Sequence, residues 1–189
     1  TAVVVTDCDH AIMRMTPPAL SRPAVPHGHP YYVLVESMGA DATRDAARFG
    51  AALWAIRDDV MQVARDGRPF IFDVSLPIFA MENYLGEVRA ALAARWAEHR
   101  CWVFGHLGDG NLHLVIRAGA PDAETRSEVE RLVYGPLAGI GGPVSAEHGV
   151  GLEKKPYLGI SRNAGEIELM RTIKRGLDPR NILNPGKIF

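Results

Sequence analysis

The sequence predicts an α+β fold in which helices pack on one face of an antiparallel sheet. Five short apolar segments have the composition of strands, and the segments between them repeat apolar residues every three or four positions, as amphipathic helices do. Two of these strands, residues 102–104 and 112–116, flank an Asp-Gly pair, which predicts a hairpin. With 189 residues, of which 47% are hydrophobic, the chain is long enough to bury a core as one domain.

The first half of the chain is predicted to contain three strands and two helices. Residues 2–6 and 31–36 are short β-branched or aromatic runs, and the proline-rich stretch between them is predicted as a loop. Residues 41–64 carry one apolar stripe at spacings of four and three, which predicts a helix. A strand over residues 70–75 and a helix over residues 81–99 follow.

Two further helices are predicted after the hairpin from their capping residues. Asp122 is a candidate N-cap, and Asn163 with Glu166 forms a capping-box pattern. Asp178 and Pro179 end the last helix. The stripes expected to be buried are Val129, Leu132, Val133 and Leu137 in the first helix, and Ile167, Met170, Ile173 and Leu177 in the second.

The hairpin is predicted to place two histidines on one face of the sheet. A two-residue type I′ loop at residues 109–110 would put His106 opposite His113, with Cβ atoms about 5 Å apart. Two neutral imidazoles that point the same way provide half of a transition-metal site. A pair of solvated surface histidines is the alternative that the pattern alone leaves open.

A second candidate segment is the glycine-rich stretch of residues 141–151, which contains Glu147 and His148. Adjacent strand residues point to opposite faces, so a shared site requires irregular backbone, which glycines permit. Together with His106 and His113, Glu147 would complete a two-histidine, one-carboxylate set suited to zinc, iron(II) or manganese. His148 would then remain as a base, and a solvated loop pair is again the alternative.

Composition narrows the classes of partner. The net charge of −1, with acidic and basic residues interspersed, argues against nucleic acid. Cys8 and Cys101 lie far apart, which indicates neither a disulfide framework nor a thiolate metal site, and a cytoplasmic protein is expected. Peripheral contact with a membrane is left open. The chain begins at Thr1 without Met, so we expect a fragment.

Five stretches, in this order, carry a resemblance to a known family: residues 53–57, 73–77, 105–113, 145–151 and 177–189. They resemble the C-terminal cap domain of FAD-linked 2-hydroxyacid oxidases and dehydrogenases, a group that includes D-lactate, glycolate-oxidase-subunit and D-2-hydroxyglutarate dehydrogenase types. The resemblance implies that residues 1–189 form one ferredoxin-like cap domain that binds substrate and metal. The FAD-binding domain of the larger flavoenzyme would lie outside the chain.

The resemblance also implies a chemistry, the oxidation of an α-hydroxy acid by hydride transfer to flavin. The positions that match the family's divalent metal site, expected to hold zinc, are His106, His113 and Glu147. His148 matches the general base, which takes the hydroxyl proton. Arg57 matches a carboxylate-binding arginine, and Asn184 resembles a residue close to the flavin.

Three departures from the family pattern bear on the substrate. Ile71 stands where members that act on longer diacids carry a lysine, Val115 where they carry an asparagine, and Met61 where they carry a hydroxyl residue. These changes leave no evident partner for a second carboxylate, which predicts a small, lactate-like D-2-hydroxy acid. The segment between Glu36 and Leu53 is also shorter than in the family by about a helix and a strand.

The electron acceptor, the metal and a homodimer are left open by the sequence. Two alternative functions, from other classes of protein, remain. A stand-alone metal-dependent hydrolase could use the same residues to activate water. A non-catalytic metal-binding module would bind the ion without either activity.

Overall fold

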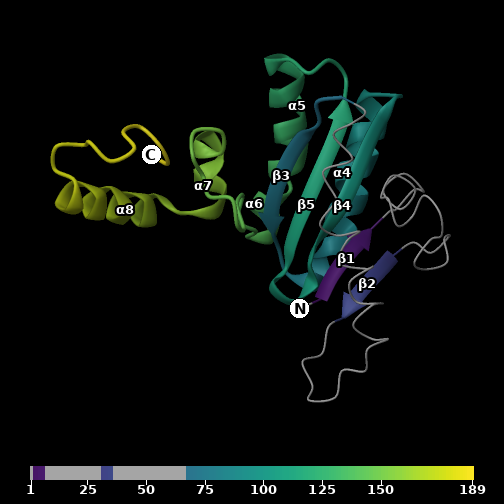
Figure 1. Cartoon of the computed structure of the whole chain (residues 1–189), viewed down its shortest axis with the longest axis horizontal. Coiled ribbons are helices and arrows are strands. Elements are labelled where there is room, and N and C mark those ends of the chain that lie inside the picture. Colours follow the sequence, from purple (N-terminus) through teal and green to yellow (C-terminus); the bar gives the residue numbers. More distant parts are fainter. Residues whose placement is uncertain (1, 7–30, 36–66) are drawn as a thin grey trace, which may run out of the picture.

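The structure is a computed structural model that describes residues 2–6, 31–35 and 67–189 (Figure 1). All five predicted strands are present and pair in one antiparallel sheet, in the order β2-β1-β4-β5-β3, which confirms the α+β prediction. The strands are β1 (Ala2–Thr6), β2 (Tyr31–Val35), β3 (Phe70–Ser75), β4 (His99–His106) and β5 (Asn111–Ala118).

The described helices agree with the capping predictions. The Asp122 side chain accepts a hydrogen bond from the Thr125 backbone N–H at 2.8 Å, and both bonds of the Asn163–Glu166 capping box are present. The predicted helix over residues 41–64 lies outside the described residues. The helices are α4 (Met81–Arg95), α5 (Ala123–Tyr134), α6 (Leu137–Ile140), α7 (Leu158–Ser161) and α8 (Ala164–Leu177), with 3₁₀ turns η2 (Ile78–Ala80), η3 (Leu107–Asp109) and η4 (Lys155–Tyr157).

Helices α4 and α5 cover one face of the sheet and enclose the core (Figure 1). Alternate strand residues point into this layer, among them Phe72 and Leu114, and Leu92 of α4 packs against them fully buried. Tyr84 ties the two helices together, because its hydroxyl donates a hydrogen bond to the Val133 carbonyl at 3.0 Å. The helices therefore cover the face that carries most of the core, and the intervening strand residues lie on the other face.

Helix α8 extends away from the sheet (Figure 1), and its predicted buried stripe is wrong. None of its residues is buried, and Ile173 and Leu177 are 53% and 79% exposed. The stripe predicted after Asp122 is buried, since Val129 and Val133 of α5 are fully buried and Leu132 is partly buried, but its last member, Leu137, lies in the separate helix α6, where it is also fully buried. The difference is that α5 packs on the sheet, whereas no described segment covers α8. Among the described residues, no helix combines the length and apolar composition needed to cross a bilayer.

Candidate functional site

The hairpin between β4 and β5 differs from the predicted two-residue loop. Residues 107–110 form the connection, and in the register His106 pairs with Asn111 while Phe104 pairs with His113. The predicted facing pair of His106 and His113 is therefore wrong. A type I′ loop needs positive φ at both central residues, but of residues 109–110 only Gly110 has it, at 74°. The three residues before Gly110 form the turn η3 instead.

The register differs from the predicted one by two residues, so both histidines still lie on the same face of the sheet. His106 and His113 are diagonal neighbours, with ring centroids 6.3 Å apart and planes at 78°. Asn111 lies directly opposite His106 and two residues before His113. The imidazole pair is thus present, with an amide side chain between its members.

Facing residues of β3, β5 and β4 form three rows on this face, about 7 Å apart because each row lies two residues beyond the last. The row next to the hairpin turn holds Ser75, Asn111 and His106; the middle row holds Asp73, His113 and Phe104; the third holds Ile71, Val115 and Trp102. The polar groups are therefore concentrated near the turn, and the third row is entirely apolar.

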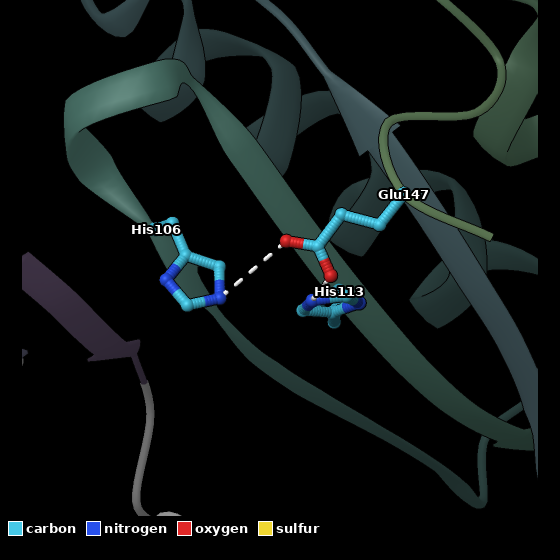
Figure 2. A group of neighbouring side chains, drawn as sticks. All are labelled: His106, His113 and Glu147. Carbon is cyan, nitrogen blue, oxygen red and sulfur yellow. Dashed lines mark ion pairs between the residues drawn. The ribbon is translucent and has the colours of Figure 1, made fainter. Parts of the chain in front are cut away.

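Glu147 completes the cluster from a distant part of the chain (Figure 2). Its Oε1 lies 3.5 Å from His106 Nε2 and its Oε2 lies 3.8 Å from His113 Nε2. The three ligand atoms all lie within 4.8 Å of one another. Ligand atoms 2.0–2.2 Å from a shared tetrahedral ion stand about 3.4 Å apart, and the two distances between Glu147 and the histidines are close to this value, as expected for a divalent ion such as zinc.

Two buried groups agree with that fit. Burial lowers the pKa of the His113 imidazole, although the charges of Asp73 and Glu147 oppose this, and the neutral ring is the form that binds metals. Asn111 donates from Nδ2 to Glu147 Oε1 at 2.6 Å, whereas its buried Oδ1 has no hydrogen-bond partner in the described part of the chain. An acceptor left unpaired beside the cluster is expected where an ion or ligand binds.

His148 lies against the same cluster. Its ring stacks on that of His113, with centroids 5.4 Å apart and planes at 29°, while 53% of its side chain is exposed. The backbone around Glu147 and His148 is irregular, as the glycine-rich composition predicted, so both neighbours reach one site. A histidine that is half open to solvent at the edge of the cluster is accessible to a bound substrate.

Asp73, which the sequence motifs did not indicate as a site residue, is fully buried and anchors this segment. Its carboxylate accepts hydrogen bonds from the backbone N–H groups of Glu147 and His148 and pairs with Lys154. Burial alone would raise the pKa of the Asp73 carboxyl, but the two backbone donors and Lys154 outweigh it and hold the pKa below its usual value. The available signal was a charged residue inside an otherwise apolar strand.

Of the two remaining predicted site residues, Arg57 lies outside the described residues, so its role stays a prediction. Asn184 lies in the exposed segment after α8, where its Oδ1 accepts a hydrogen bond from Lys187 at 3.3 Å. Its predicted position near a flavin stays a prediction.

The fold and the cluster together define an α+β domain with a candidate metal site on the sheet face opposite α4 and α5. The profile of the family described as "FAD linked oxidases, C-terminal domain" matches residues 33–188. The chain belongs to this family, which confirms the resemblance inferred from its motifs.

Relatives of the chain are named D-2-hydroxyglutarate dehydrogenases. The chain is 36% identical over 191 residues to a D-2-hydroxyglutarate dehydrogenase of Xanthomonas citri pv. viticola, covering 85% of this chain and 40% of the relative. It is 36% identical to the mitochondrial D-2-hydroxyglutarate dehydrogenase of Bos taurus, covering 85% of this chain and 34% of the relative. For the Stutzerimonas stutzeri D-2-hydroxyglutarate dehydrogenase the identity is 37%, and the shares are 72% and 31%. The chain thus spans between 31% and 40% of the length of these relatives.

Proposed function

We propose that this chain is the substrate- and metal-binding C-terminal part of an FAD-dependent dehydrogenase that oxidises a D-2-hydroxy acid to the 2-oxo acid. The observation that carries the proposal is the cluster of His106, His113 and Glu147, with His148 stacked beside it. The family match and the names of the relatives support the reaction class. The flavin would be held by a domain outside this chain.

Each residue of the cluster has a defined part in this proposal. His106, His113 and Glu147 would hold a divalent ion, which when bound lowers the pKa of a coordinated hydroxyl. His148 would take the hydroxyl proton as the hydride leaves the α-carbon for the flavin, because imidazole is the side chain best suited to proton transfer near neutral pH. Arg57 would orient the substrate carboxylate through its planar guanidinium.

The metal assignment is tested with His113→Ala in the complete flavoprotein. We expect metal retention and turnover to be lost while flavin remains bound, because the ligand is removed from the cap and not from the flavin site. His99→Ala is the matched control, since His99 lies at the far end of β4 and its Nδ1 contacts the Trp96 carbonyl at 2.9 Å. Unchanged metal content in His113→Ala would refute the assignment.

We further propose a substrate with a small or apolar tail, such as lactate. Ile71 and Val115 face each other in the register, and with Trp102 they leave the row beyond His113 without a polar side chain. The names of the relatives point to D-2-hydroxyglutarate instead. A comparison of the two substrates in one turnover assay distinguishes these possibilities. A higher kcat/KM for D-2-hydroxyglutarate than for D-lactate would reject the apolar-tail proposal.

Ile71→Lys tests which side chain sets this preference. Ile71 is 39% exposed, so a longer charged side chain has room to extend. A hydrogen bond to a charged group contributes about 1.5–3 kcal/mol, so the preference for a dicarboxylate should rise by roughly tenfold or more. Ile71→Met is the control of similar length without charge, and an equal change in both variants would show that charge is not the cause.

A further inference from the structure

We propose that Asp73 is the positioning residue that holds Glu147 and His148 over the histidine pair. This inference rests on the proposed metal site and adds to it a residue that would act through its contacts with other protein groups. Asp73 lies in the middle of β3, directly opposite His113 in the register. The segment that it binds comes more than 70 residues later in the chain.

The hydrogen bonds are made to backbone and therefore fix where the two side chains begin, and Asp73 Oδ2 also lies 4.0 Å from Nδ1 of the His148 ring. Asp73 Oδ2 accepts from the His148 N–H at 2.7 Å and from the Glu147 N–H at 2.9 Å, and Oδ1 lies 3.1 Å from the same Glu147 nitrogen. The Asp73 carbonyl also accepts from the Ala146 N–H at 3.3 Å. Three consecutive residues of the segment are thereby joined to the strand that faces His113.

Lys154 and Ser145 complete this anchor. Lys154 Nζ lies 3.3 Å from both Asp73 Oδ2 and the Asp73 carbonyl, and donates to Ser145 Oγ at 2.9 Å. Ser145 Oγ lies 3.2 Å from Asp73 Oδ2. Only 9% of the Lys154 side chain and none of the Asp73 side chain is exposed, so each charge is compensated by the other rather than by water.

The Glu147 side chain itself is only partly held by its neighbours. It is 46% exposed, the one hydrogen bond described for it is the donation from Asn111 Nδ2, and its oxygens lie 3.5 and 3.8 Å from His106 and His113 Nε2. A buried ion pair by itself contributes little net stability. The pair of Asp73 and Lys154 instead fixes the position of the segment that carries the candidate ligand Glu147. Residues that orient metal ligands typically change metal affinity by 10–100-fold when replaced.

The test is zinc affinity of the complete protein, measured by competition with a chromogenic chelator. The variant Asp73→Asn combined with Lys154→Met removes both charges, so no buried lysine is left unpaired. We expect zinc affinity to fall by roughly 10–100-fold, and excess zinc to restore part of the turnover. Asp73→Glu is the second variant, because it keeps a charge for Lys154 but moves the carboxylate by one methylene, and a smaller loss in the same direction is expected.

Asp178→Asn is the matched control. Asp178 is also buried, pairs with Lys174 and accepts from two backbone N–H groups, those of Ile182 and Leu183, but it lies at the end of α8 away from the cluster. It should leave zinc affinity unchanged even if it lowers the melting temperature. Wild-type protein that binds no zinc would overturn both the proposed function and this inference. Zinc binding by wild type with unchanged affinity in the Asp73 variants, or an equal loss in Asp178→Asn, would overturn the positioning role alone.

Discussion

Gly105 is a glycine that the geometry of the candidate site requires. It lies in β4 opposite Leu112, next to His106. A Cβ at this position would stand 2.1 Å from the Asn111 carbonyl oxygen and 3.0 Å from Leu112 Cα. Ordinary contact begins at 3.4 Å, so β4 and β5 would have to separate by about 1.3 Å (3.4 − 2.1) where Asn111 faces His106.

Gly105→Ala is therefore expected to destabilise the protein and to disturb the cluster. Backbone shifts forced by an added methyl cost typically about 1–3 kcal/mol. With a urea dependence of about 1–3 kcal/mol per molar, the unfolding midpoint should fall by roughly 1 M. Zinc affinity should fall as well, because the displaced residues are the neighbours of His106.

Gly108→Ala is the matched control within the same hairpin. A Cβ there meets nothing within 4 Å, and Gly108 has no positive φ. The assay is urea unfolding of both variants, followed by zinc titration of the folded protein. Equal unfolding midpoints and equal zinc affinities in the two variants would refute the close approach of the strands.

Two further predictions concern the core and the end of α8. Leu92→Ala should lower the free energy of unfolding by about 2–5 kcal/mol in urea, because Leu92 is fully buried beneath the sheet, and a change below 1 kcal/mol would contradict this packing. The bond from Lys174, with the backbone donors Ile182 and Leu183, lowers the pKa of Asp178 from 3.8 to about 2. The stabilisation from this carboxylate should be fully present above pH 3.8 and lost as the pH falls toward 2, and an NMR titration midpoint near 3.8 would refute it.

Local features were predictable because their causes are local. The N-cap at Asp122 and the capping box at Asn163 depend on atoms three residues apart, and both are present. The strand pairing around the Asp-Gly turn was also predictable, but its register was not. Asp109 lies in a 3₁₀ turn, where its Oδ1 accepts a hydrogen bond from the Asn111 N–H at 3.2 Å. This turn makes the loop longer than the predicted two residues.

The grouping of His106, His113 and Glu147 was predictable from the sequence, but the residue that anchors Glu147 was not. His106 and His113 share a face in either register, because a shift of two residues preserves strand alternation. The role of Asp73 was missed, since the backbone N–H groups and the lysine that it binds lie far along the chain, and only a charge within an apolar strand marked it. The stripe of α8 had the periodicity of a buried face, yet burial depends on a neighbour that periodicity cannot show.

The sequence by itself determined the strands, the capped starts of α5 and α8 and the identity of the donor side chains, since propensity, capping and side-chain chemistry belong to short segments, whereas the helix predicted over residues 81–99 ends at Arg95. The tertiary structure alone decided the hairpin register, the approach of Glu147 to the two imidazoles and the anchoring of its segment on Asp73. Those distances join residues far apart in the chain, and they are fixed by sheet pairing and buried hydrogen bonds that form only when the whole domain packs.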